Sequence, residues 1–109
     1  MINIEFIETS VFTKLITELL EDNDYKDLQE MLAENLQAGD LIPGGGGLRK
    51  LRWSSPRKQK GKRGGIRVVY YIYSAHKLYM IYAFEKGEKA DLTKKQLKIL
   101  REYVKGGLL

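Results

Sequence analysis

Two neighbouring segments rich in β-branched and aromatic residues constrain the fold of this chain more than any other feature. Residues 66–73 are IRVVYYIY and residues 78–84 are LYMIYAF, with only four residues between them. Residues of these types favour strands, and so short a connection is typical of a β-hairpin. Because both segments are almost continuously apolar, we expect them at the centre of a sheet, with both faces at least partly covered.

The N-terminal residues predict a strand followed by a helix. Residues 2–8 alternate between apolar and polar side chains, as a half-buried strand does. Apolar side chains then recur three and four positions apart over residues 11–20, which is the spacing of one buried helical face. Either Thr9 or Ser10 can serve as the N-cap of this helix.

A second helix is expected between Tyr25 and Leu36, where apolar residues recur with the same spacing. Asp24 is its expected N-cap, and Gly39 is the expected stop signal. Only a short polar segment separates this helix from the first. We therefore expect the two to form a helical hairpin.

Pro43 and the four glycines 44–47 interrupt the pattern before a strand expected over residues 48–53. Four glycines are typical of a flexible connector with high backbone freedom. They are also a candidate phosphate-binding loop, although they lack the Lys-Ser/Thr pair of a P-loop and the spacing of a dinucleotide fingerprint. Residues 54–65, SSPRKQKGKRGG, are polar and basic and predict an exposed loop.

The C-terminal part predicts one further helix. Thr93 and Gln96 have the spacing of a capping box, apolar residues follow on one face, and Gly106 and Gly107 end the helix. The expected element order is β-α-α-β-β-β-α. This order predicts a single α+β domain over residues 1–109, in which a small antiparallel sheet with a mixed edge carries the N-terminal helical hairpin and the C-terminal helix.

The residue types that are missing restrict the chemistry. The chain has 109 residues, with no Cys and with His76 as its one histidine. These residues cannot assemble a structural zinc site or a cysteine nucleophile, and we expect neither a metal nor another cofactor. The absence of Cys fits a reducing compartment, and the N-terminal segment is acidic where a signal peptide is basic, so we expect the cytoplasm.

Charge is distributed unevenly along the chain. Residues 1–42 hold ten acidic and two basic side chains, whereas residues 43–109 hold four acidic and seventeen basic ones, so the net charge of +5 conceals balances of −8 and +13. Residues 48–67 include nine basic residues and no acidic one, which is the footprint of a polyanionic partner. Nucleic acid is favoured over a membrane surface, because these charges fall in strands and loops rather than on an amphipathic helix.

The expected strands bring some of these cations together. Lys50 and Arg52 share one face of their strand, with Arg49 on the other. If the strands pair consecutively, Arg52, Arg67 and Lys86 converge at one end of the sheet. Lys86 is expected in phase with three side chains of the hairpin: Met80, Tyr82 and Phe84. Fixed guanidinium groups hold phosphate oxygens in pairs, so this convergence suits a phosphate, whereas the alternative is a solvated charged face.

Other chemistry-bearing side chains have simpler interpretations. The hairpin tyrosines can stack on bases, but most are expected in the core, with one or two facing a ligand. These are Tyr70, Tyr71, Tyr73, Tyr79 and Tyr82. His76 is expected to face solvent in the hairpin turn, far from Arg67, which argues against a role as general base. Glu85 and Glu88 are expected to orient neighbouring lysines rather than act as an acid–base pair.

Three segments carry a likeness to a known family: GGLRKLR at 46–52, GKRGGIRVVYY at 61–71 and YAFEKGEKADLT at 82–93. Together they resemble the RelE/HigB-like toxins of type II toxin–antitoxin systems, and the likeness extends over nearly the whole chain. The resemblance implies a RelE-like toxin that enters the A site of the bacterial ribosome and cleaves translated mRNA. It also implies a cognate antitoxin that holds the toxin inactive. From the placement of the basic residues we expect no membrane partner.

The resemblance implies roles for individual residues. Arg67 matches the arginine that contacts the scissile phosphate, with Arg52, Lys86 and Lys89 as further cationic groups of the catalytic site. The implied contacts with mRNA and ribosomal RNA fall on the basic strand and loop, namely Arg49, Lys50, Arg57, Lys58, Lys60, Lys62 and Arg63. The implied chemistry is attack by the RNA's own 2′-hydroxyl on the adjacent phosphorus, which requires no protein nucleophile.

The resemblance leaves the acid–base group and the target open. Some members have a tyrosine near the start of the last helix, but residues 91–93 here are Asp-Leu-Thr, which leaves Tyr82 or Tyr103 as a substitute. Two other functions remain: a ParE-like toxin that binds gyrase, and a non-catalytic RNA-binding module. The basic cluster and the expected approach of Arg67 to Lys86 favour the ribonuclease. The acidic N-terminal half either offers a surface to a basic antitoxin segment or keeps the basic half soluble.

Overall fold

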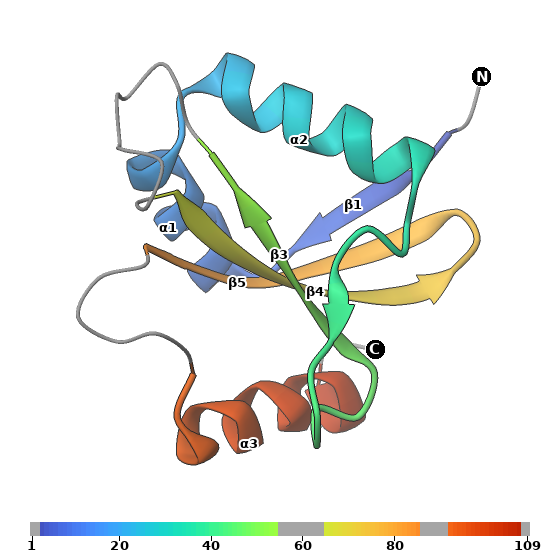
Figure 1. The fold of residues 1–109 in the computed structure, drawn as a ribbon. Coiled ribbons are helices and arrows are strands. Elements are labelled where there is room, and N and C mark those ends of the chain that lie inside the picture. The colour runs from blue at the N-terminus through green and yellow to red at the C-terminus, as the bar shows by residue number, and fades with distance from the viewer. Residues whose placement is uncertain (1–2, 55–64, 86–91, 108–109) are drawn as a thin grey trace.

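The computed structural model describes residues 3–54, 65–85 and 92–107, and it has the predicted α+β class (Figure 1). The strands are β1 (Glu5–Glu8), β2 (Asp40–Leu41), β3 (Leu48–Trp53), β4 (Ile66–Ser74) and β5 (Lys77–Glu85). The helices are α1 (Ser10–Leu19), α2 (Asp22–Glu34) and α3 (Lys94–Glu102), and α3 continues into a π-helical turn over Tyr103–Gly107. The order agrees with the prediction except for β2, which the sequence analysis missed.

The strands form one mixed sheet in the order β1-β5-β4-β3-β2. β4 and β5 make the predicted hairpin, and β3 and β2 continue the sheet antiparallel on one side. β1 lies parallel to β5 and makes the mixed edge. The two apolar segments thus occupy central positions, as predicted.

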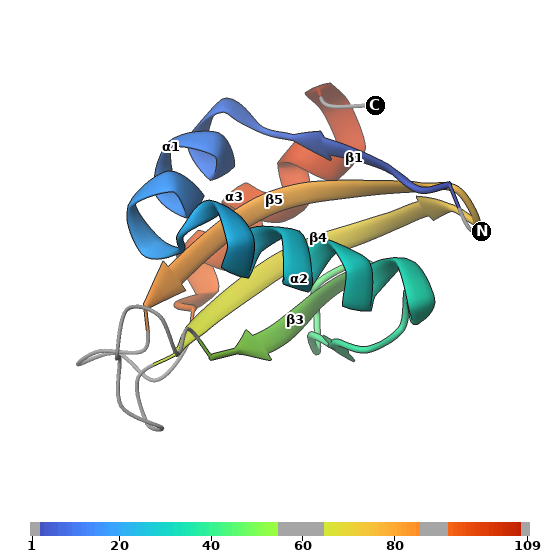
Figure 2. The ribbon, with the colours of Figure 1, turned by 90° about the horizontal axis from the view of Figure 1, so that it is seen from above.

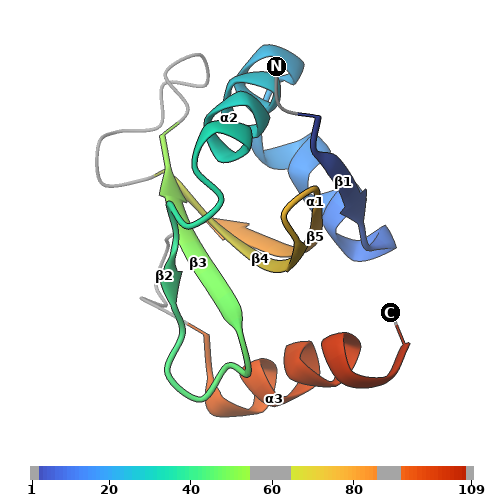
Figure 3. The same cartoon turned by 90° about the vertical axis from the view of Figure 1, so that its right-hand side faces the viewer.

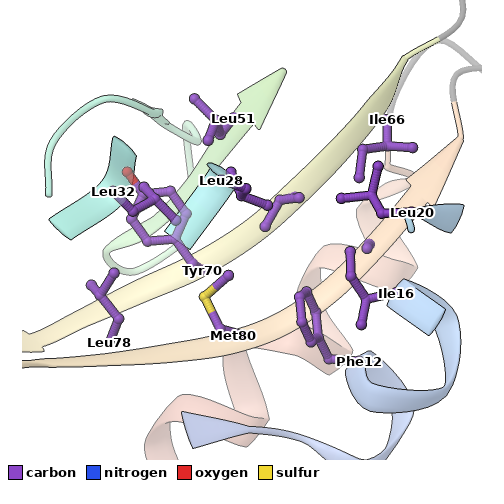
Figure 4. Close-up of a cluster of buried hydrophobic side chains, with 12 residues drawn as sticks. Phe12, Ile16, Leu20, Leu28, Leu32, Leu51, Ile66, Tyr70, Leu78 and Met80 are labelled. Atoms are coloured by element: carbon purple, nitrogen blue, oxygen red, sulfur yellow. The ribbon is translucent and has the colours of Figure 1, made fainter. Parts of the chain in front are cut away.

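Helices cover the two faces of the sheet unequally (Figures 1 and 3). α1 and α2 pack on the face that carries Leu51, Val68, Tyr70 and Met80, which we call the hairpin face. Figure 4 shows this larger core, whose members come from both helices and the sheet. α3 packs on the opposite face, over a smaller core. We call this the α3 face; its strand residues include Leu48, Val69, Tyr82 and Phe84.

The N-cap of α1 is as predicted, but the start of α2 is not. Thr9 Oγ1 accepts a hydrogen bond from the Phe12 amide at 2.9 Å. Asp24 is not the N-cap of α2, because the helix begins two residues earlier, after Glu21. Asp24 lies instead in the first turn and is 2% exposed. A carboxylate there faces the positive end of the helix dipole, which stabilises the helix without a capping geometry.

The end of α2 also differs from the prediction. The helix stops at Glu34, with Asn35 as its C-cap, and so ends well before Gly39. The cause is a tertiary contact of Tyr70, which is fully buried. Its hydroxyl donates to the Leu36 carbonyl at 2.7 Å and accepts from the Gly39 amide at 2.8 Å. These bonds fix the segment after the helix as a loop.

The four glycines, predicted as a flexible connector, form a turn between β2 and β3. Gly44, Gly46 and Gly47 have positive φ angles of 73°, 66° and 104°. A Cβ atom on Gly47 would lie 2.8 Å from Cε1 of Tyr71, and the Gly44 carbonyl accepts from Arg101 Nη1 at 2.9 Å. The turn therefore packs against β4 and α3, and these contacts account for its glycines without a phosphate.

α3 begins with the predicted capping box. Thr93 Oγ1 accepts from the Gln96 amide at 3.0 Å, and Gln96 Oε1 accepts from the Thr93 amide at 2.9 Å. The helix buries Leu100, and Val104 of the following turn is buried beside it. Among the described helices, none is long and apolar enough to cross a membrane.

Candidate nucleic-acid interface

Arg52 and Arg67 lie directly opposite each other on neighbouring strands. Arg52 of β3 pairs with Arg67 of β4, and Arg67 pairs in turn with Phe84 of β5. Because cross-strand partners share a face, all three side chains belong to the α3 face. Figures 1 and 2 show that β3 and β5 end, and β4 begins, at the same end of the sheet. The predicted convergence of Arg52 and Arg67 is therefore confirmed.

A β-bulge places aromatic side chains beside this pair. Val69 pairs with Tyr82 but Tyr70 pairs with Met80, so Ile81 is an extra residue on β5. The bulge shifts the alternation of side chains by one position. Met80 consequently packs on the hairpin face, while Tyr82 and Phe84 pack on the α3 face, with ring centroids 5.9 Å apart. The prediction that Met80 shares their face was wrong, because it assumed unbroken alternation.

The bulge is held by a contact from outside the hairpin. Thr9 Oγ1 donates to the Ile81 carbonyl at 2.8 Å, and the Thr9 amide donates to the Met80 carbonyl at 3.0 Å. Thr9 is itself buried at the start of α1. Thr9 therefore caps α1 and also holds the bulge that determines which side chains of β5 lie on the α3 face beside Arg67.

The arginine pair combines a buried guanidinium with an exposed one. Arg67 is 7% exposed, whereas Arg52 is exposed. Two neighbouring guanidinium groups can donate charge-assisted hydrogen bonds to the oxygens of one phosphate. The pair is therefore a candidate phosphate site.

The start of β4 depends on a glycine. Gly65 has a φ of +54°, and a Cβ atom there would lie 2.8 Å from the carbonyl oxygen of Trp53. Trp53 directly follows Arg52 on β3 and pairs with Ile66. Gly65 therefore lets β4 begin close against β3, which sets the register that brings Arg67 opposite Arg52.

The remaining cations of β3 lie on opposite faces, as predicted. Lys50 pairs with Val69 and so shares the α3 face with Arg52. Arg49 instead donates from Nη1 to the Gly39 carbonyl at 2.6 Å, on the hairpin face and beside Tyr70. This bond gives Arg49 a structural role at the end of the α2 loop. Its predicted contact with ribosomal RNA remains a prediction.

The hairpin tyrosines are mostly packing residues, as expected. Tyr70 and Tyr79 are buried, Tyr71 and Tyr82 are half-buried, and Tyr73 is 53% exposed. Burial raises the pKa of the Tyr70 hydroxyl above its ordinary value. The Lys77 ammonium lies 5.5 Å from the Tyr73 ring centroid, near the hairpin turn.

His76 is exposed in that turn, at the end of the hairpin opposite Arg67. Its position therefore agrees with the expectation that it faces solvent. The register also separates it from the arginine pair, since Ser74 pairs with Lys77 at one end of the hairpin and Arg67 with Phe84 near the other.

Several predicted site residues lie outside the described residues. They are Arg57, Lys58, Lys60, Lys62, Arg63, Lys86, Glu88 and Lys89. Their roles, and the convergence of Lys86 with Arg67, stay predictions. Conversely, sequence reasoning missed four cations of the last helix and its following turn: Lys94, Lys98, Arg101 and Lys105. Their spacing of four, three and four residues was a visible helical signal.

Comparison with protein families gives a match over most of the chain. The sequence model of a family described as "RelE toxin of RelE / RelB toxin-antitoxin system" matches residues 5–108. The match includes the strands that carry both arginines, the bulged β5 and the whole of α3.

Proposed function

The chain belongs to the RelE toxin family and is the toxin of a toxin–antitoxin pair, and from this premise we propose that it is a ribosome-dependent endoribonuclease that cleaves mRNA in the ribosomal A site. Its family membership also supplies one partner, a cognate antitoxin. The observation that carries the proposal is the buried Arg67 opposite Arg52, since this pair provides a fixed site for one phosphate. The proposed action on the ribosome favours a cytoplasmic location.

The proposed reaction uses a nucleophile from the substrate. The 2′-hydroxyl of one nucleotide attacks the adjacent phosphorus, and the bond to the 5′-oxygen of the next nucleotide breaks. The 2′-oxygen loses its proton and the departing 5′-oxygen gains one, so the products carry a 2′,3′-cyclic phosphate and a 5′-hydroxyl. The protein supplies position and charge, which fits a chain without Cys and with His76 remote from the arginine pair.

Arg67 contributes most in this scheme because it is the more rigidly held guanidinium. At 7% exposure its position is set by the surrounding sheet, so it is already oriented when extra negative charge develops on the phosphate. Arg52, which is exposed, donates further hydrogen bonds to the phosphate oxygens. Lys86 and Lys89 are proposed as further cations of the site, and Lys50 with the loop cations as RNA contacts.

Tyr82 is the better placed of the two candidate proton-transfer groups. It pairs with Val69, two residues from Arg67 on the same face, and it touches Phe84. Tyr103 lies nine residues beyond the start of α3, about 13 Å along the helix axis. We therefore assign proton transfer to Tyr82 and expect Tyr82→Phe to slow cleavage more than Tyr103→Phe.

The experiment compares wild type with Arg67→Ala during induced expression in a bacterial host, with mRNA 5′ ends mapped while translation proceeds or is blocked. Cuts within translated frames are expected for wild type and are expected to vanish with either the substitution or the block. Growth arrest with intact mRNA and damaged DNA would instead indicate a gyrase-directed toxin. RNA binding that declines in proportion to the charge removed, without cleavage, would indicate an RNA-binding module.

A further inference from the structure

α3 and the turn that follows it carry a row of cations on one flank. Lys94, Lys98, Arg101 and Lys105 are spaced by four, three and four residues, so they form a single stripe along the helix. We call these four residues the α3 basic stripe. The three lysines are exposed and Arg101 is half-buried. From Lys94 to Arg101 the stripe extends about 10 Å along the axis.

The stripe faces the strand that carries Arg52. Arg101 Nη1 donates to the Gly44 carbonyl in the turn that leads into β3. The opposite flank of α3 contains Gln96 and Ile99, which line a cavity of about 180 Å³ with Tyr82 of β5. The basic flank is therefore turned toward β3 and the apolar flank toward β5. Figures 1 and 2 show that α3 begins at the end of the sheet where β3 finishes.

Helix stability does not account for the stripe. Like charges at these spacings destabilise a helix, and Lys94 stands at the positive end of the helix dipole, which disfavours a cation. α3 and its following turn have one acidic residue, Glu102, which lies off the stripe. Among the described residues, no salt bridge joins a stripe lysine to a carboxylate. The helix thus keeps four unfavourably placed cations along the flank that is turned toward β3.

We propose that the α3 basic stripe binds the phosphate backbone of RNA that extends from the Arg52/Arg67 site. The inference rests on the proposed function only in taking RNA as the polyanion. RNA is favoured over an acidic protein segment because the stripe lies on the same face as the phosphate site and begins, at Lys94, at the same end of the sheet. Successive cations along one flank match a polymer with regularly repeated charge.

The test uses two variants with the same net charge. The stripe variant carries Lys94→Gln, Lys98→Gln and Lys105→Gln, and it keeps Arg101 because that side chain anchors the Gly44 turn. The control variant carries Lys14→Gln, Lys26→Gln and Lys95→Gln, three exposed helix lysines off the stripe. Binding to a 2′-O-methyl single-stranded RNA 20-mer, which is not cleaved by 2′-hydroxyl attack, is measured by fluorescence anisotropy from 50 to 200 mM KCl.

We expect wild type and the control variant to share one salt dependence and the stripe variant to have a weaker one. Loss of three phosphate contacts lowers the slope of log affinity against log salt by about 2.1, so wild-type affinity falls about 18-fold more than that of the stripe variant over this fourfold range of salt. Equal slopes for the two variants would overturn the proposal. So would retained RNA binding together with lost binding of polyglutamate, which would assign the stripe to an acidic protein segment. Because the RNA is uncleavable, failure of the nuclease proposal leaves this readout intact.

Discussion

The two faces of the sheet differ in charge, in packing and in what their buried polar groups do. The hairpin face carries α1 and α2, which together hold six acidic and two basic side chains, over the larger core. The α3 face carries a helix and turn with five basic side chains and one acidic, over a smaller core. The uneven charge along the chain thus becomes opposite charge on two layers.

Buried polar groups on the two faces are also of different kinds. On the hairpin face, the Tyr70 hydroxyl has a donor and an acceptor partner within the protein. On the α3 face, Arg67 is buried opposite a second arginine. The first arrangement stabilises the fold, whereas the second brings together two donor groups from which one anion can accept hydrogen bonds. This contrast directs the search for a binding site to the α3 face.

The largest expected effect on stability is the loss of a large side chain from the core of the hairpin face, compared with the same loss on the α3 face. Leu28→Ala, at a fully buried position of the hairpin face, is expected to lower the free energy of unfolding by about 2–5 kcal/mol. Leu100→Ala on the α3 face is expected to cost less, since Leu100 already borders a cavity. Urea denaturation of both variants checks the order. Equal losses would show that the two cores are equally well packed.

Tyr70→Phe is expected to be the next largest effect on stability. It leaves the Gly39 amide and the Leu36 carbonyl without their partner, which costs about 1–3 kcal/mol for buried polar groups. Because Tyr70 lies on the hairpin face, RNA cleavage by the folded variant is expected to match wild type. Urea denaturation and a cleavage assay measure the two quantities. A wild-type free energy of unfolding would refute the structural role of this hydroxyl.

Alkaline pH offers a third test of the hairpin face. Burial raises the pKa of both Tyr25 and Tyr70 in the folded protein, and the bond from Tyr25 to Glu8 raises the Tyr25 value further. Above the ordinary value near 10 the unfolded chain loses these protons while the folded protein keeps them. The free energy of unfolding should therefore fall as pH rises through 10, by up to about 1.4 kcal/mol per pH unit for each tyrosine. The decline should be shallower in Tyr70→Phe, and an equal decline would contradict this assignment.

The smallest effect concerns the exposed member of the arginine pair. Arg52→Gln removes one charge-assisted contact and relieves the like-charge repulsion with Arg67, so cleavage is expected to slow about tenfold while stability stays level or rises slightly. Cleavage of a programmed mRNA on purified ribosomes checks the rate. Cleavage by Arg52→Gln at the wild-type rate would show that Arg52 has no role in the reaction.

Local sequence patterns predicted the parts of the molecule that depend on neighbouring residues. The central hairpin and the capping box at Thr93 follow from residue types at short spacings, and consecutive strands were enough to bring Arg52 opposite Arg67. The failures depended on distant contacts. The bulge at Ile81 is held by Thr9, 72 residues away, and the end of α2 is set by Tyr70. No local pattern carries such information.

We propose that the α3 face performs the chemistry while the hairpin face supplies stability. Its most direct test is single-turnover cleavage of a programmed mRNA on purified ribosomes by wild type, Arg67→Ala and Tyr70→Phe, with urea denaturation of each. We expect Arg67→Ala to lose about 10²–10³-fold in cleavage rate and to remain folded, and Tyr70→Phe to lose stability but retain its rate. A folded Arg67→Ala variant that cleaves as fast as wild type would contradict the claim.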